Sequence, residues 1–187
     1  VPLLKKENDQ YTIEQEAPKT IGRLSTFFGN IGIVLRAYVY MRVLGLEGIK
    51  KNSIYSVLNA RYLKNKIKEH IPVEIDQDNM HEFVLTLKDK DRFGDFNAMV
   101  FAKNLIDHGF HAPTVYFPLI VKEALMIEPT ETESKQTLDE FIDTVAAIVE
   151  EYKTNPDRVL HAPHTLPVKR CDEVTAARNP DLVFEKK

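Results

Sequence analysis

The sequence has little cysteine and little glycine, and each shortage excludes a class of site. Cys171 is the single cysteine among 187 residues, so neither an internal disulfide nor a thiolate zinc site can form. The seven glycines are about half the usual share of roughly 7%, and none falls in a GxGxxG, GxxxxGKS or GxxxxGKT motif. We therefore expect neither a dinucleotide-binding loop nor a P-loop.

Motifs for metal binding and nucleophilic catalysis are also missing. The six histidines include no HExxH pair, and we expect no metal site. There is no GxSxG motif, and Cys171 lies in a charged stretch of the tail. His81 and Glu82 open a predicted strand, where neighbouring side chains point to opposite faces, so the two cannot act together as acid and base.

Charge and hydropathy favour neither nucleic acid nor a membrane as partner. The formal net charge is -3, with no block of five or more like charges. Arg36 and Arg42 interrupt the longest apolar run, which is too short for a membrane helix. The single cysteine suits a reducing compartment, so we expect a cytoplasmic protein. Because Val1 replaces an initiator methionine and no signal peptide follows, we expect part of a longer protein.

The hydrophobic pattern of the first 70 residues predicts an arm followed by two helices. Residues 1–20 have no helical period, and we expect at most one short strand, around Tyr11 to Ile13. Ile31 to Leu44 is apolar nearly all round, which is typical of a helix buried on several sides. Asn52 to His70 is amphipathic, and Gly45 and Gly48 predict a short turn between two antiparallel helices.

The remainder alternates between strand and helix patterns. Strands are predicted near 73–76, 81–87, 115–117 and 124–127, and helices over 97–109, 134–152 and 172–178. Thr130 and Glu133 form a possible capping box for the helix over 134–152. This order predicts an α+β fold, with helices packed on a small, mostly antiparallel sheet. The predicted organisation is a connecting arm over 1–20 and one domain over 21–187, ending in an irregular tail.

Two stretches could contact a ligand. Thr20 to Asn30 leads into a helix N-terminus, where backbone N–H groups can hold an anion, but local physics favours a simple helix cap with Phe27 and Phe28 in the core. Gly109 to Thr114 is a turn beside predicted strand ends, which are common ligand sites, although such a turn needs no function.

Several separate motifs, in order, carry a resemblance to one family. They are Gly22-Arg-Leu-Ser-Thr-Phe-Phe-Gly-Asn30, Leu58-Asn-Ala-Arg-Tyr-Leu63, Met80-His-Glu-Phe83, Asp107-His-Gly-Phe-His-Ala-Pro-Thr114 and Met126-Ile-Glu-Pro-Thr-Glu-Thr-Glu133. Over residues 18–183 the chain resembles the closing third of the pyridoxal-phosphate-dependent glycine decarboxylases, the P-proteins of the glycine cleavage system. It is most similar to the second subunit of the bacterial two-subunit form.

The resemblance implies both a fold and a chemistry. The implied fold is the small C-terminal domain of the aspartate-aminotransferase-like enzymes, known as fold type I. In the family, pyridoxal phosphate is the cofactor, glycine loses its carboxylate, and the aminomethyl group passes to the lipoyl arm of the H-protein. The implied partners are the missing cofactor domain, the other P-protein subunit and the lipoylated H-protein.

The family's Schiff-base lysine belongs to the large domain, upstream of Val1. Lys64, Lys88, Lys90 and Lys103 lie in charged neighbourhoods, whereas such a lysine needs a shielded site. The resemblance therefore implies no catalytic residue in this chain, no cofactor bound by it alone and no activity without the rest of the enzyme.

The resemblance also suggests which residues would line the cleft of the intact enzyme. The candidates are Arg23, Asn30, His81, His111 and Thr114.

Two alternatives remain open. One is a noncatalytic interaction module that binds a partner through the apolar helix from Ile31 to Leu44. The other is the small domain of another aminotransferase-like enzyme. The stretch from Met126 to Glu133 disfavours the second alternative, because it offers Glu128 and Glu131 where such enzymes commonly place an arginine for the substrate carboxylate.

Overall fold

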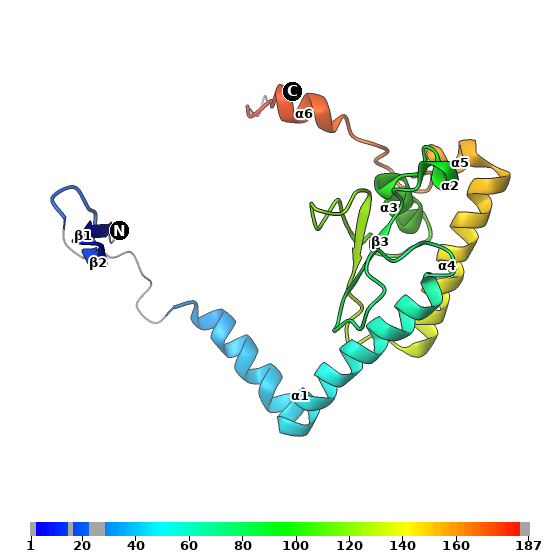
Figure 1. Ribbon diagram of the computed structural model, residues 1–187. Coiled ribbons are helices and arrows are strands. Elements are labelled where there is room, and N and C mark those ends of the chain that lie inside the picture. The colour runs from blue at the N-terminus through cyan, green and yellow to red at the C-terminus, as the bar shows by residue number, and fades with distance from the viewer. Residues whose placement is uncertain (1–2, 15–16, 23–28, 184–187) are drawn as a thin grey trace. The chain divides into compact units, whose positions relative to one another are not determined.

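The computed structural model describes residues 3–14, 17–22 and 29–183. The chain divides into two compact units, residues 1–49 and 50–187 (Figure 1). The predicted limits of an arm over 1–20 and a domain over 21–187 stay a prediction, because compact units need not coincide with domains. No helix in the described ranges is long and apolar enough to cross a membrane.

The first unit begins with an antiparallel hairpin of β1 (Leu3–Glu7) and β2 (Gln10–Glu14). The prediction of at most one strand here was wrong. Asn8 and Asp9 join the strands with φ angles of 50° and 60°. Asparagine and aspartate tolerate this left-handed conformation, and two such residues in succession make a hairpin turn whose twist suits the strands.

Helix α1 (Ile31–Ile67) has helical backbone on both sides of one non-helical residue, Gly45, with φ 62° and ψ -179°. The predicted break between two helices is confirmed at Gly45, but residues 46–48, which were predicted as part of the turn, are helical. The antiparallel arrangement of the two helices stays a prediction. Gly45 tolerates a positive φ because it has no Cβ. At the start of the helix, Asn30 Oδ1 accepts a hydrogen bond from the N–H of Ile33 at 3.3 Å.

The apolar side chains at the start of α1 are exposed. Between residues 31 and 43, nine large apolar side chains are 46–78% exposed: Ile31, Ile33, Val34, Leu35, Tyr38, Val39, Tyr40, Met41 and Val43. The sequence predicted that the helix starting at Ile31 is buried on several sides, and this prediction is wrong for residues 31–43 in the structure. An apolar pattern on all sides is typical of a helix that is contacted from several sides, and the described part of this unit does not cover residues 31–43.

The second unit is built on a three-stranded antiparallel sheet in the order β3-β5-β4. The strands are β3 (Phe83–Thr86), β4 (Thr114–Val115) and β5 (Ala124–Ile127). A further strand over 73–76 was predicted, but the only ladder contact there is a single bridge from Val73 to Leu85. The polar and acidic residues that follow leave nothing to extend the ladder.

The described part of this unit also contains five helices: α2 (Lys90–Phe93), α3 (Ala98–Asp107), α4 (Lys135–Thr154), α5 (Pro156–Leu160) and α6 (Glu173–Arg178). The predictions of α3, α4 and α6 are confirmed, and α2 and α5 were missed. The predicted capping box of Thr130 and Glu133 was wrong. Ser134 caps α4 instead, because its Oγ accepts a hydrogen bond from the N–H of Thr137 at 3.1 Å.

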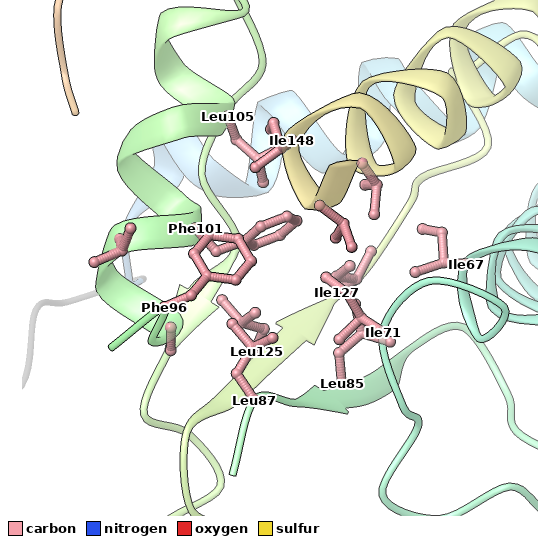
Figure 2. Packing of buried hydrophobic residues seen from close by; sticks show 14 of the residues in the cluster. Ile67, Ile71, Leu85, Leu87, Phe96, Phe101, Leu105, Leu125, Ile127 and Ile148 are labelled. Atoms are coloured by element: carbon pink, nitrogen blue, oxygen red, sulfur yellow. The ribbon is translucent and has the colours of Figure 1, made fainter. Parts of the chain in front are cut away.

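The core lies between the sheet, the end of α1, and helices α3 and α4 (Figure 2). It contains the fully buried side chains of Ile67, Leu85, Phe101, Leu125 and Ile148. Full burial of each such side chain contributes about 1.5–3 kcal/mol. The α+β fold class is confirmed, and it is consistent with the small C-terminal domain of a glycine decarboxylase.

Candidate functional site

A pocket of about 460 Å³ opens in the second unit, which is within the size range of ligand pockets. Two segments form much of its wall: residues 109–113 between α3 and β4, and residues 126–130, which are the end of β5 and the loop after it. Side chains at the start of α4 complete the wall. Leu63, Ile127 and Leu138 are buried at its apolar floor. The pocket therefore has an apolar floor, and its rim is formed by the loop after α3 and by the loop after β5.

The polar groups of the pocket lie mostly at its rim. His111, Glu128 and Thr130 are exposed, whereas Glu133 and Thr137 are half-buried. Two carboxylates and no lysine or arginine line the pocket. The site is therefore suited to a group that is neutral or positively charged, and not to a phosphate.

The end of α3 fixes the first wall segment. Gly109, at φ 82°, donates its N–H to the carbonyl of Ile106 at 3.0 Å, and Phe110 donates to the carbonyl of Leu105 at 3.0 Å. This pair of bonds is the Schellman motif that ends many helices. It turns the chain so that the Phe110 ring packs edge-on against Phe141 of α4, with centroids 5.2 Å apart.

Asn59 of α1 fixes the second wall segment. Its Nδ2 donates to the carbonyl oxygens of Thr130 at 2.9 Å and Glu133 at 3.2 Å. The sequence reasoning did not select Asn59 as a site residue. A signal was present, because Asn59 lies one helical turn before the buried Leu63 and so shares its face.

Three of the five predicted cleft residues lie at or beside the pocket. His111 lines the pocket directly. His81 Nε2 lies 3.6 Å from Glu128 Oε1, and both side chains are about half exposed. Thr114, in β4, pairs in register with Met126, which also lines the pocket. Their roles as cleft residues stay a prediction.

The other two predicted residues are not brought to this pocket. Arg23 lies outside the described residues. Asn30 belongs to the first unit, where its side chain caps α1. A helix cap was the structure that local physics favoured for this stretch, and Phe27 and Phe28, which the same prediction placed in the core, lie outside the described residues.

A second polar group beside the pocket was not predicted. Tyr62 of α1 donates a short hydrogen bond to Asp139 of α4, and Lys135 lies 2.6 Å from the same carboxylate. The hydrogen bond from Lys135, followed by that from Tyr62, holds the pKa of Asp139 below its ordinary value. The Asp139 side chain is half-buried and already paired with Lys135 and Tyr62, so the group mainly orients the helices rather than providing a reactive acid.

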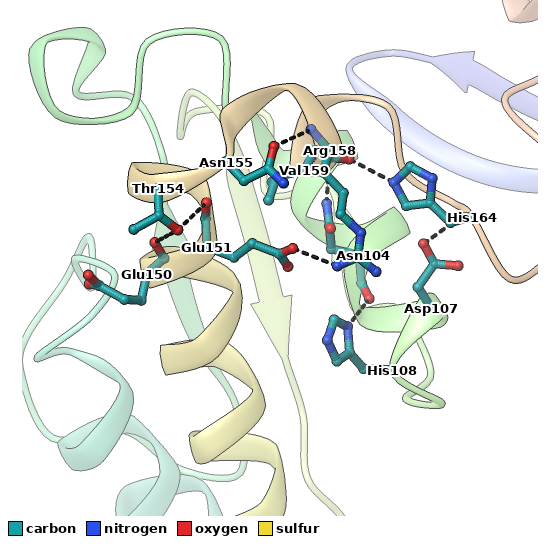
Figure 3. Close-up of polar contacts among 10 residues, drawn as sticks. All are labelled: Asn104, Asp107, His108, Glu150, Glu151, Thr154, Asn155, Arg158, Val159 and His164. Carbon is teal, nitrogen blue, oxygen red and sulfur yellow. Dashed lines mark hydrogen bonds and ion pairs between the residues drawn. The ribbon is translucent and has the colours of Figure 1, made fainter.

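A third polar group joins α3 to the chain that follows α5 (Figure 3). The carboxylate of Asp107 accepts hydrogen bonds from the backbone N–H of His164 at 2.6 Å and of Thr165 at 2.8 Å, and from the Thr165 hydroxyl at 2.7 Å. Partial burial acts to raise the pKa of Asp107, but these hydrogen bonds outweigh burial and lower it. Asp107 therefore acts as a clamp on the chain after α5.

The described residues do not fit a pyridoxal phosphate site. Lys64 is the one buried lysine in the described ranges, and its ammonium hydrogen-bonds to the carbonyl of Gln77 and lies 3.6 Å from Asp76. It is thus an ion-paired structural lysine rather than a free amine. The carboxylates at the pocket would also repel a phosphate. Within the described ranges, no cluster of three histidine, cysteine, aspartate or glutamate side chains could hold a metal ion.

Comparison with known proteins identifies the family. The family described as "Glycine dehydrogenase, C-terminal domain" matches residues 52–166. Proteins named probable glycine dehydrogenase (decarboxylating) subunit 2 are 49% identical in Staphylococcus epidermidis, 49% in Caldanaerobacter subterraneus subsp. tengcongensis and 50% in Staphylococcus aureus.

These matches cover 98–100% of the chain, which spans only 37–38% of the length of these relatives. The matched residues 52–166 include the pocket, the sheet, and helices α3 and α4. The chain therefore belongs to the glycine dehydrogenase C-terminal domain family.

Proposed function

We propose that this chain supplies the C-terminal domain of the second subunit of a glycine decarboxylase. The intact enzyme would decarboxylate glycine and transfer the remaining aminomethyl group to the lipoyl arm of the H-protein. The names of relatives that are 49–50% identical over nearly the whole chain support this proposal. Pyridoxal phosphate, bound elsewhere in the intact enzyme, would supply the electron sink for loss of the carboxylate.

The pocket at residues 109–113 and 126–130 is the observation that carries the role of this domain. Its apolar floor and carboxylate rim can exclude water and position a neutral or cationic group, but they offer no free lysine for covalent catalysis. We assign to this chain one wall of the cleft. His81, His111 and Thr114 are the candidates at that wall.

The proposed partners follow from the relatives' names. A protein called subunit 2 requires another subunit, and the proposed chemistry requires the lipoylated H-protein. Cys171 is a free, exposed thiol, which suits a reducing compartment. We therefore place the intact enzyme in the cytoplasm.

Exchange of the glycine carboxylate with labelled bicarbonate tests the proposal. The chain would replace the matched 185 residues of the Staphylococcus epidermidis subunit 2, and the full-length hybrid would be assayed with the first subunit, H-protein and pyridoxal phosphate. We expect exchange by the hybrid assembly and none by the chain alone. A well-folded, assembled hybrid without exchange would favour a noncatalytic interaction module.

A further inference from the structure

Residues 31–43 of α1 are apolar and exposed, and the proposed cleft wall gives no reason for this exposure. Its nine exposed apolar side chains are distributed around the whole helix and not along one stripe. Residues two positions apart point about 200° apart on a helix. Val39, 56% exposed, and Met41, 50% exposed, therefore lie on nearly opposite faces.

The charged residues of this segment do not define a water-facing side. Arg36 and Arg42 are six positions apart, which places them about 120° apart around the axis. A helix that rests on a surface keeps one broad polar face, whereas a helix that is apolar all round is contacted from several sides. Residues 31–43 follow the second pattern.

Pairing of this helix with the same helix of a second copy does not satisfy this pattern. When two identical helices pair, each buries one seam and leaves its opposite face in water. If Val39 lay in such a seam, Met41 would stay exposed, and the reverse also holds. The occupant must instead present a groove that closes around the helix.

We infer that residues 31–43 insert into an apolar groove of the polypeptide that the longer relatives carry outside the region matched here. That polypeptide is large enough to surround a helix, because the matched chain accounts for only 37–38% of those relatives. The groove would contact the Val39 face and the Met41 face at the same time. The inference depends on the family relationship, and it does not depend on the glycine chemistry.

Thiol labelling at the two opposite faces tests this inference. In a Cys171→Ser background, Val39→Cys and Met41→Cys are made in the chain alone and in the full-length hybrid described above. Lys153→Cys, on the exposed side of α4, serves as the matched control. We expect rapid labelling of both positions in the chain alone and at least about tenfold slower labelling of both in the hybrid, with position 153 unchanged.

Protection of only one position in the hybrid would overturn the inference, because the contact would then be one-sided. Concentration-dependent protection of both positions in the chain alone would also overturn it in favour of self-association.

If the hybrid does not fold, a second measurement replaces the labelling test. Amide hydrogen exchange is then measured in the unmodified Staphylococcus epidermidis subunit 2, at the segment that aligns with residues 31–43. Slow exchange there supports the inserted helix and fast exchange contradicts it. If the hybrid protects both cysteines from labelling but does not exchange the glycine carboxylate with bicarbonate, only the proposed function is contradicted.

Discussion

Asn59 Nδ2 donates a hydrogen bond to the carbonyl oxygen of Thr130 at 2.9 Å, across 71 residues of sequence. This single amide connects the helix beneath the pocket to the loop that forms its rim. The same side chain also reaches the carbonyl of Glu133. The position of the rim therefore depends on one residue of α1.

Replacing Asn59 with alanine should loosen this rim. We expect Asn59→Ala to lower the free energy of unfolding by about 1 kcal/mol, because one exposed and one part-buried hydrogen bond are lost. Amide hydrogen exchange between residues 130 and 134 should become faster. Asn65→Ala, an exposed position on the same helix, is the matched control. Equal exchange rates in the two variants would contradict the assigned role of Asn59.

The core of the second unit offers a sharp comparison between two leucines. Leu125 is fully buried in β5, whereas Leu119 is 87% exposed in the loop that precedes this strand. We expect Leu125→Ala to lower the free energy of unfolding by about 2–5 kcal/mol, because it leaves a cavity. Leu119→Ala should change it by less than about 0.5 kcal/mol. Urea denaturation measures both, and similar losses would contradict the described packing.

The clamp at Asp107 predicts a dependence of stability on pH. The pKa of Asp107 is lowered in the folded state from its ordinary value of 3.8. The carboxylate therefore stabilises the fold above this ordinary value, and the stabilisation is lost as the pH falls through the lowered pKa. At neutral pH we expect Asp107→Asn to lower the free energy of unfolding by about 1 kcal/mol, an estimate reduced for partial exposure.

The difference between the wild-type chain and Asp107→Asn should shrink as the pH is lowered from about 7 to about 3, because only the wild-type side chain titrates. Urea denaturation at several pH values measures this difference. Asp143→Asn, an exposed position on α4, should show neither effect. A difference for Asp107→Asn that stays constant over this range would show that the carboxylate charge does not contribute.

Long periodic segments of the sequence predicted their structures well. Helix α4 carries an apolar residue at every third or fourth position over twenty residues, and β5 was predicted with the same limits that the structure shows. Helices α2 and α5, with four and five residues, are too short to display a period. Their local caps, Asp89 and Asn155, were the available signals.

The pocket could be predicted only in part. Its two wall segments follow strand ends and a helix stop, which placed His111 among the candidates. The contact of Asn59 with Thr130 depends on how α1 packs against a loop 71 residues away, and no local pattern encodes that distance. The exposure of Val39 and Met41 in α1 was mispredicted, because an apolar pattern on all sides of a helix predicts burial without indicating what covers the helix.

Titration of the purified chain with pyridoxal phosphate, with and without glycine, tests the central claim most directly. Borohydride reduction followed by peptide mapping would locate any lysine adduct. We predict no stoichiometric, specific adduct, because the buried Lys64 is held by Gln77 and Asp76 and the pocket carries carboxylates. A specific adduct on one lysine would show that this chain holds its own cofactor site and would contradict its assignment as a supporting wall of the cleft.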